Sequence, residues 1–387
     1  GFIENTVSNY YLPFAIAPNF LINKELFAIP MVIEESSVVA AASNTAKFWL
    51  ERGGFKTEVI STTKNGQIHI NFYGDDLAIQ TFFSETKSIL IESISEIEKN
   101  MKKRGGGLLD IILINATDSL EGYYQLHCTF ETSDAMGANF INTCLEEIAK
   151  TLENTSKLHT DFILKNTFPE IVMSILSNYV PECLVKAQVS CPVEEMSANG
   201  MDGKTFVSKF IRAVEIAKID KRRAVTHNKG IMNGIDAVIL ATGNDFRSVE
   251  AGIHAYASKN GNYTSLTNAK IENGIFIFSI EIPLAIGTIG GLTGLHPLVN
   301  FGLSLLQKPS AKKLMQIIAV AGLAQNFAAL RSLVTTGIQR GHMKMHLANI
   351  LNNLVVTQSE TEKTLAYFKD HTITHSSVAN FIKQLRK

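Results

Sequence analysis

The chain has little of what marks membrane, metal-binding or disulfide-stabilised proteins. Its 387 residues contain only four cysteines, at positions 128, 144, 183 and 191, and no CxxC pair. This scarcity argues against a zinc module and against a secreted disulfide framework, and it favours a reducing, cytoplasmic setting. Lysine plus arginine and aspartate plus glutamate both number 36, so no net charge would attract nucleic acid or an anionic membrane.

Long apolar runs are missing as well. The two most apolar stretches, 317–330 and 282–292, are interrupted by Gln325 and Asn326 or by glycines. Both fall short of the ~20 residues that a membrane helix needs, so we expect no membrane span. The chain begins with Gly1, and no basic-then-apolar signal segment follows, so we expect a trimmed N-terminus.

The composition is that of a globular protein, with 45% apolar and 19% charged residues. A length of 387 residues predicts two or three domains at ~150 residues each. From residue 67 to about residue 166, the apolar period changes between two and 3.6 in the order βαββαβ, which is the ferredoxin-like order. The expected elements are a strand at 67–72, a helix at 75–101, strands at 109–114 and 123–131, a helix at 134–152 and a strand at 161–165.

The flanking regions have a different composition. Alanine, glycine and asparagine occur there in runs with helical spacing at 230–240, 245–258 and 312–333. Such helices pack closely, so the flanks are expected to form one large domain that the small one interrupts. Beyond residue 340 the chain is polar and amphipathic. The sequence predicts an α+β fold, with a mixed helical and sheet large domain, an inserted ferredoxin-like domain and a C-terminal helical flap. The expected boundaries are 1–57 and 182–338 for the large domain, 58–181 for the small domain and 339–387 for the flap.

Glu34 and Glu35 form the first candidate site. Apolar runs flank both carboxylates, which would be partly desolvated; burial raises a carboxyl pKa and provides a proton donor near neutral pH. The alternative is a helix N-terminus, at which the acids and Ser36 or Ser37 complement the helix dipole.

Lys229 is the second candidate, because it stands between Asn228 and Gly230 where an apolar helix is expected to begin. An ammonium at that position could hold a developing oxyanion, with Asp245 as the nearest acid to pair with it. The alternative is two capped helix starts, one at Asn228 and one at Asn244.

His342 and His346 lie one helical turn apart, which is metal-ligand spacing. No HExxH glutamate accompanies them and zinc needs a third ligand, so we expect no metal. A general-acid role for one histidine on a terminal segment fits its ordinary pKa better. An exposed histidine without a role is the remaining alternative.

The stretch 134–139, Asp-Ala-Met-Gly-Ala-Asn, opens the second helix of the small domain. Small residues at a helix start expose N–H groups, so a pyrophosphate could bind there. The alternative is an Asp134 cap with Gly137 and Ala138 packed tightly. Since no strand–GxGxxG–helix unit occurs, a dinucleotide would be held by something other than a Rossmann domain.

Taken together, these stretches resemble the class II, bacterial-type hydroxymethylglutaryl-coenzyme A reductases over nearly the whole chain. The motifs that carry the resemblance are 4–7 (ENTV), 30–35 (PMVIEE), 134–139 (DAMGAN), 175–178 (ILSN), 226–236 (THNKGIMNGID), 241–245 (ATGND) and 339–343 (QRGHM).

The resemblance implies reduction of 3-hydroxy-3-methylglutaryl-CoA to mevalonate and free CoA by two nicotinamide hydrides, feeding isoprenoid synthesis. It implies a homodimer or higher even oligomer with interface active sites, a small cofactor domain inserted in a large substrate domain, and a C-terminal flap. By motif, the catalytic residues would be Glu35 (acid), Lys229 (oxyanion holder), Asp245 (partner of both) and His342 (proton donor to the CoA thiolate). The substrate would be held by Arg223, Ser37 and Asn233, and the cofactor by Asp134, Met136, Gly137, Asn139 and Asn178.

The sequence departs from the family where Ser36 replaces a proline that some members carry after the acid pair, and where an N-terminal segment that helps bind CoA is absent. Cofactor choice depends on the helix that ends near residue 104. Glu98 falls where an acid in some relatives accepts ribose hydroxyl bonds and favours NAD. Basic side chains crowd the same helix end and could hold a 2′-phosphate, which slightly favours NADPH: Lys99, Lys102, Lys103 and Arg104.

Three other functions compete with this one. The same enzyme could run backwards as a catabolic, NAD-dependent mevalonate dehydrogenase. A non-catalytic CoA-binding or acyl-binding protein would leave Lys229 and His342 as surface groups. A metallohydrolase built on His342 and His346 would be sensitive to chelators.

Overall fold

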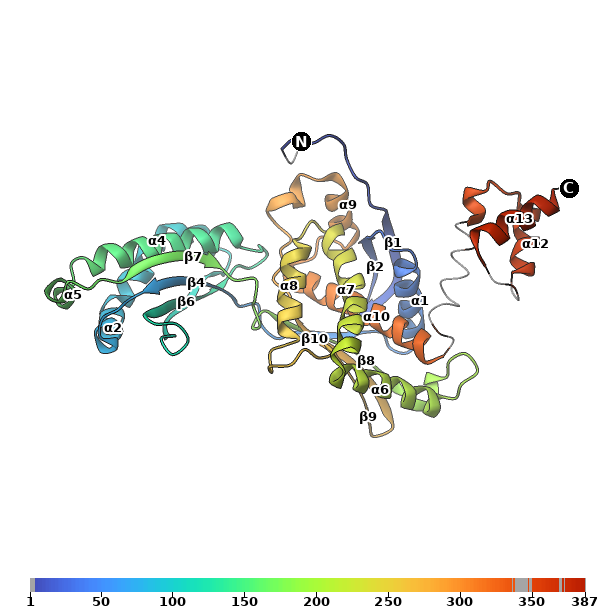
Figure 1. Ribbon diagram of the computed structural model, residues 1–387, viewed down its shortest axis with the longest axis horizontal. Helices are drawn as coiled ribbons and strands as arrows, with labels where there is room; N and C mark the ends of the chain where they lie inside the picture. Colours follow the sequence, from blue (N-terminus) through green and yellow to red (C-terminus); the bar gives the residue numbers. More distant parts are fainter. Residues whose placement is uncertain are drawn as a thin grey trace.

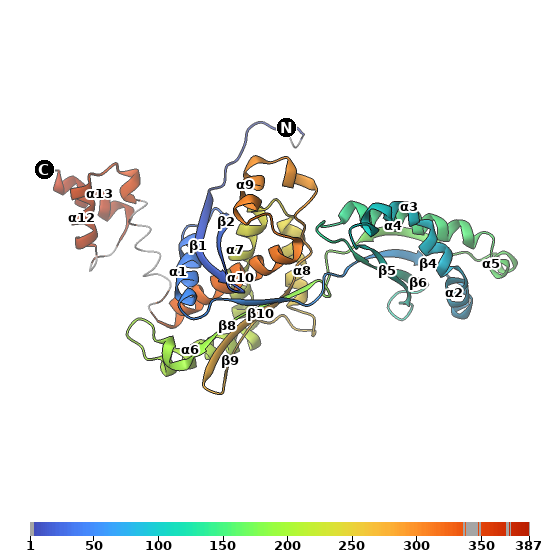
Figure 2. The same ribbon diagram turned by 180° about the vertical axis from the view of Figure 1, so that it is seen from behind.

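The computed structural model describes residues 4–335, 337, 347, 350–368, 371 and 373–386. Helices occur together with sheets whose strands all pair antiparallel, which confirms the mixed α+β class. Figures 1 and 2 show a central body with a separate unit at one side, drawn from the green and light-blue part of the chain. We call residues 64–176 the small unit and the central body the large unit. Each has its own hydrophobic core.

A hairpin opens the large unit. Strands β1 (Phe14–Ile22) and β2 (Glu25–Val32) pair antiparallel, and the two residues between them, Asn23 and Lys24, both have positive φ values of 48° and 71°. Two left-handed residues form the turn that matches the twist of a hairpin, and asparagine tolerates that conformation better than most residues.

The main sheet of the large unit has four antiparallel strands in the order β3-β8-β10-β9. Strands β8 and β10 alternate between half-buried and buried residues, as expected when helices cover one face more completely than the other. The strands are β3 (Lys56–Val59), β8 (Leu184–Pro192), β9 (Thr267–Glu272) and β10 (Ile275–Pro283).

Helix α10 (Ala311–Val334) runs through the centre of the large unit (Figure 1). Its length and hydropathy would allow it to cross a membrane, but most of its apolar part is buried inside the protein, which is typical of a core helix. Around it pack helices α1 (Val38–Leu50), α6 (Gly203–Ile219) and α7 (Lys221–Ala241), with α8 (Phe246–Tyr256) and α9 (Pro297–Leu305) further out and the short turns η1 (Val193–Met196) and η2 (Gly291–Gly294) in the connections.

The small unit contains a four-stranded antiparallel sheet in the order β5-β6-β4-β7. Its helices cover one face, and the buried residues of β4 and β6 alternate towards them. The elements in chain order are β4 (Lys64–Asn71), α2 (Asp76–Ser93), α3 (Ser95–Lys102), β5 (Gly107–Asn115), β6 (Tyr123–Glu131), α4 (Ala138–Ser156), α5 (Thr160–Lys165) and β7 (Glu170–Leu176).

Two predictions for the small unit were wrong. Residues 161–165 form helix α5 and not a strand, and the last strand is β7, five residues later. The run is too short for periodicity to separate the two states, and the β-branched residues lie in 170–176. The helix expected at 75–101 is two helices that break at Ile94, whose φ of −100° and ψ of 6° leave the helical region. Helix α4 begins at Ala138, four residues later than expected.

In the large unit, the helix that carries Lys229 begins earlier than expected. Helix α7 starts at Lys221, with Asp220 as its cap, and the Asp220 carboxylate accepts hydrogen bonds from the main-chain N–H groups of Arg222 and Arg223. Asn228 therefore lies inside the helix and is no cap. The cap of α8 is Asp245 and not Asn244.

In the described part of the C-terminal region, residues 350–368 and 373–386 are mostly helical. Helices α12 (Gln358–Tyr367) and α13 (His375–Leu385) each begin with a capping box and pack on each other in a small core of their own.

Candidate active site

The first feature of the site is a close ion pair between the two main sequence candidates. Lys229 Nζ lies 2.6 Å from Glu35 Oε2, and Asn233 Nδ2 donates to the same oxygen over 3.1 Å. Lys229 and Asn233 are four residues apart on α7, so both side chains lie on one face of the helix. A carboxylate, an ammonium and an amide therefore converge on one point.

The position of Glu35 follows from where strand β2 ends. The apolar alternation of β2 stops at Val32, and the chain turns before α1 begins at Val38. Glu34 and Glu35 lie in this turn and not in the sheet. The predicted partial desolvation was wrong for Glu34, which is exposed, whereas Glu35 is half-buried, with 37% of its side chain exposed. The Lys229 side chain is 61% exposed in the single chain.

Ser37 has two unusual features. Its φ of 81° is left-handed, which is uncommon for a residue other than glycine. Its hydroxyl is buried and has no hydrogen-bond partner among the described residues. Buried polar atoms are nearly always paired, so an unpaired hydroxyl on a strained residue indicates a place for a ligand.

Arg223 lies in the first turn of α7, on the same helix as Lys229. Its guanidinium makes no hydrogen bond or ion pair with another side chain that the structure describes, and burial lowers its pKa. A half-buried, unpaired guanidinium is suited to a ligand carboxylate.

Asp245 does not pair with Lys229 or Glu35 in the described part of the chain, contrary to expectation. Its carboxylate caps α8 instead, accepting hydrogen bonds from the main-chain N–H groups of Arg247 and Ser248 over 3.1 and 3.2 Å. An N-cap carboxylate is held by the helix that it caps, which explains its position.

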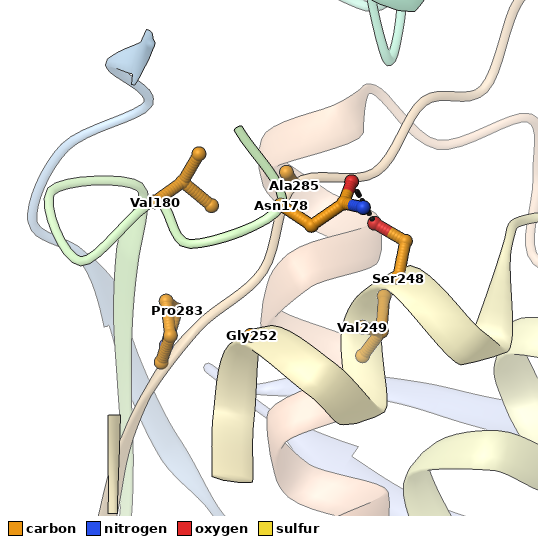
Figure 3. A pocket seen from close by; sticks show the side chains of 7 residues that line it. All are labelled: Asn178, Val180, Ser248, Val249, Gly252, Pro283 and Ala285. Atoms are coloured by element: carbon orange, nitrogen blue, oxygen red, sulfur yellow. Dashed lines mark hydrogen bonds between the residues drawn. The ribbon is translucent and has the colours of Figure 1, made fainter. Parts of the chain in front are cut away.

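Asn178 is tied to the same turn. Its side-chain oxygen accepts a hydrogen bond of 2.8 Å from the Ser248 hydroxyl, as Figure 3 shows. Asn178 follows β7, where the chain returns from the small unit, so this bond joins the return segment to the α8 cap. Ser248 was not singled out from the sequence, because nothing in its local pattern distinguishes it from any residue in a first helical turn.

Two cavities lie beside the segment that returns from the small unit to the large unit, and both are lined by Asn178, Val180 and Ala285. The first continues along α8 (Figure 3). The second reaches into the small unit, where its lining includes Lys64, Met136 and Ala138. Three sequence candidates from distant motifs thus lie at one junction: Met136, Asn178 and the Asp245 turn.

The turn 132–137 borders the second cavity. Gly137 has a φ of 91°, and a Cβ there would lie 2.4 Å from the Thr132 side chain, so only glycine fits. Helix α4 then begins without a side-chain cap, which leaves N–H groups of its first turn free for an anion. Asn139 lies exposed in that first turn.

Asp134 is engaged in hydrogen bonds with the large unit and is not a free side chain that could bind a cofactor. Its Oδ1 accepts a 2.7 Å hydrogen bond from the main-chain N–H of Ala311, the first residue of α10. The Asp134 carbonyl accepts from the N–H of Thr288 over 2.8 Å. The residue therefore ties the 132–137 turn to the large unit.

Glu98 is buried, with 1% of its surface exposed, and pairs with Lys102 over 3.1 Å. A carboxylate in that position is not offered to a ribose. Lys99, Lys103 and Arg104 are exposed at the same helix end, and the Arg104 carbonyl accepts a hydrogen bond from the Ser133 hydroxyl. The basic helix end is thus held next to the 132–137 turn.

His342 and His346 lie outside the described residues. Among those described, no group of three or more histidine, cysteine, aspartate or glutamate side chains could hold a metal ion.

Comparisons with known proteins show which family the chain resembles. A relative from Archaeoglobus fulgidus, a 3-hydroxy-3-methylglutaryl-coenzyme A reductase, is 38% identical over 94% of this chain and 80% of its own length. A probable reductase of the same name from Borreliella burgdorferi is 34% identical over 91% of this chain and 78% of its own length.

Among solved structures, the class II reductase of Streptococcus pneumoniae, bound to NADPH in open conformations, superposes with a TM-score of 0.78 at 36% identity, covering 86% of this chain and 88% of the other. The model of the hydroxymethylglutaryl-coenzyme A reductase family matches residues 1–347. With the Glu35–Lys229 pair and these matches together, the chain belongs to the hydroxymethylglutaryl-coenzyme A reductase family.

Proposed function

We propose that the Glu35–Lys229 pair is the catalytic centre for the reduction of 3-hydroxy-3-methylglutaryl-CoA to mevalonate and CoA, the reaction of the family to which the chain belongs. The observation that carries this proposal is the 2.6 Å contact between the Lys229 ammonium and the Glu35 carboxylate, on two elements far apart in sequence. When bound, the nicotinamide cofactor supplies the two hydrides.

The chemistry needs a positive charge at the thioester carbonyl. Each reduction makes that carbonyl oxygen negative, and an ammonium held in place stabilises the oxyanion. Glu35 fixes the ammonium and can exchange a proton with it, so that the oxyanion formed by the second hydride is protonated and stays in the product as a hydroxyl. Asn233 holds the Glu35 oxygen from the other side and limits its rotation.

The substrate would be held by the side-chain groups of Arg223 and Ser37, which have no hydrogen-bond partner among the described residues. The Arg223 guanidinium would bind its carboxylate through charge-assisted hydrogen bonds, and the buried Ser37 hydroxyl would donate to the substrate. Asp245, at the α8 cap, would act as the acidic neighbour of Lys229 once substrate and cofactor are bound.

The residues at the junction fit a dinucleotide. Helix α4 offers uncapped N–H groups to the pyrophosphate, next to Met136, Gly137 and Asn178. The exposed Lys99, Lys103 and Arg104 favour a 2′-phosphate, whereas Glu98 is buried, so we propose NADPH as the preferred cofactor.

His342 would protonate the CoA thiolate when it leaves, because its ordinary pKa suits a proton donor near neutral pH. We further propose the domain division given by the sequence, with residues 58–181 inserted between the two parts of the substrate domain and 339–387 as a flap. The four cysteines are free and buried, which suits a reducing cytoplasm.

The test is the rate of NADPH oxidation with the thioester substrate, measured for Lys229→Ala and Glu35→Gln. We expect kcat to fall by about 10²–10³ or more in each, because the oxyanion loses its cation or the cation loses its anchor. Lys221→Ala is the matched control: this lysine is exposed on the same helix and should keep the wild-type rate. A Lys229→Ala rate within twofold of the wild type would favour a non-catalytic CoA-binding protein.

The direction of the reaction is tested with both cofactors. We expect NADPH to give the higher kcat/KM in the reductive direction. A strong preference for NADH, together with fast oxidation of mevalonate by NAD and CoA, would support the catabolic enzyme instead.

A further inference from the structure

A buried lysine lies beneath the 132–137 turn and has no part in the chemistry above. Lys64, the first residue of β4, is only 4% exposed. Its Nζ donates to Thr132 Oγ1 and, over 2.9 Å, to the Ala135 carbonyl. The Thr132 hydroxyl in turn donates to the same carbonyl over 2.7 Å. One ammonium thus holds both ends of the turn that leads to Met136 and Gly137.

The turn is held from the other side by the large unit. Asp134 accepts hydrogen bonds from Ala311 and Thr288, as described above. Gly287 approaches so closely that a Cβ on it would lie 2.3 Å from the Met136 nitrogen. The Gly287 N–H donates to Asn244 Oδ1 over 2.8 Å, directly before Asp245. The turn therefore lies between Lys64 and the segment that carries the α8 cap.

A lysine at this place is unfavourable for folding alone. Burial lowers the Lys64 pKa, and the neighbouring Cys183, Glu131 and Asp134 act in the opposite direction. An apolar side chain of similar length would avoid the cost of removing a charge from water. Selection of an ammonium here needs a reason beyond packing, and the contacts with the turn provide one.

We propose that Lys64 is a positioning residue for the nicotinamide cofactor: its ammonium fixes the 132–137 turn at the junction, so that Met136, Gly137 and the start of α4 keep the geometry that the dinucleotide needs. Lys64 also lines the junction cavity together with Met136 and Asn178. The inference rests on the proposed function, because it assigns the cofactor to this turn. It concerns cofactor binding and leaves the Glu35–Lys229 chemistry unchanged.

The experiment compares Lys64→Met, which keeps the length and loses the charge, with Lys64→Arg, which keeps the charge. The dissociation constant of NADPH is measured by fluorescence titration without substrate, alongside steady-state kinetics. We expect Lys64→Met to raise the NADPH Kd and KM by about tenfold or more, as loss of charge-assisted hydrogen bonds predicts. The KM for the thioester should change by less than about twofold. Lys64→Arg should recover part of the loss.

Two further variants make the outcome decisive. Lys157→Met is the control, since this lysine of the small unit is exposed and its only ion pair with a described residue is the one with Glu153. Thr132→Val removes one acceptor of the Lys64 ammonium and leaves the charge in place. It should also weaken NADPH binding. This variant tests the contact even if Lys64→Met lowers the melting temperature. An unchanged NADPH Kd in Lys64→Met and Thr132→Val overturns the inference and leaves the reductase function intact. A wild-type protein that binds NADPH but never oxidises it with the thioester would instead refute the proposed function.

Discussion

Ionisable side chains on helix α7 occupy two opposite environments. Lys229 is largely exposed and meets Glu35, whereas His227, two residues earlier, is buried at the opposite face. His227 Nε2 lies 2.7 Å from Thr267 Oγ1 and 3.0 Å from Ser265 Oγ. Asp236, further along the helix, is half-buried beside Glu250. One helix therefore supplies both the reactive ammonium and groups whose protonation makes the stability of the fold depend on pH.

His227 should make the protein sensitive to acid. Burial lowers its pKa to about 3, so the folded protein keeps it neutral while the unfolded chain binds a proton below pH ~6.5. Its contribution to stability is therefore present above that pH and falls as the pH drops towards 3, by up to about 1.4 kcal/mol per unit. Urea unfolding of His227→Gln at pH 7 and pH 4.5 should show lower stability but a flatter pH dependence. His375→Gln, at an exposed helix start, should keep the wild-type slope.

Asp236 should act in the opposite direction. Burial, with Glu250 beside it, raises its pKa, so the folded protein holds a proton that the unfolded chain releases above pH ~4. The contribution of Asp236 to the free energy of unfolding is thus largest at low pH and declines as the pH rises towards the raised pKa. In urea unfolding, the free energy of unfolding of Asp236→Asn minus that of the wild type should be larger at pH 8 than at pH 5. An identical pH slope in both proteins would show that Asp236 is ionised in the fold.

At the scale of elements, helices α7 and α10 pack closely at Gly234. A Cβ there would lie 2.4 Å from the Ala321 carbonyl oxygen of α10. Glycine within a helix costs about 1 kcal/mol relative to alanine, so its presence reflects this close packing.

Gly234→Ala should therefore destabilise the protein by about 1–3 kcal/mol, despite the better helix propensity of alanine. Gly230→Ala is the matched control, because a Cβ at that position of the same helix would meet no atom of another described segment within 4 Å. It should be neutral or stabilising by up to about 1 kcal/mol. Equal denaturation midpoints for the two variants would contradict the close contact.

The cap of α8 separates two roles of Asp245. Asp245→Asn keeps a side-chain oxygen for the N–H groups of Arg247 and Ser248, so stability should change little. Asp245→Ala should lose about 1 kcal/mol through the missing cap. If Asp245 serves the reaction as proposed, both variants should lose activity alike in the NADPH assay. An active Asp245→Asn would leave the residue as a helix cap only.

At the scale of the molecule, the ion pair is more open than the reaction allows. Lys229 is 61% exposed in the single chain, and an oxyanion is best stabilised where water is excluded. We expect a second subunit or the C-terminal segment to cover the pair. Light scattering should give the mass of a homodimer or a higher even oligomer, and specific activity should fall on dilution below the dissociation constant. A fully active monomer would refute cover by a second subunit and would leave the C-terminal segment as the cover.

The sequence predicted elements well where the period was long and regular. Strand β6 has the expected bounds, and α10 differs from the expected helix by one residue at each end. The prediction failed at 161–165, where five residues hold too little periodicity to separate a strand from a helix. It also failed at the start of α7, because polar residues in its first two turns hid the apolar pattern.

For the site, the motifs identified Glu35 and Lys229, but not their exposure. That depends on where β2 leaves the sheet and on what covers the turn. Ser248 and Lys64 could not be identified, because their local patterns resemble those of ordinary polar residues.

The sequence by itself determined the α+β class, most elements of the small unit, the large-unit helices near 245–258 and 312–333 and, through its motifs, the family. Only the tertiary structure decided that Glu35 and Lys229, 194 residues apart, meet within 2.6 Å, that Asp245 caps a helix and that Lys64 is buried. The physical reason is one of range. Helical and strand periodicity depends on residues that are close in the sequence, whereas burial and contact depend on how segments far apart in the sequence pack.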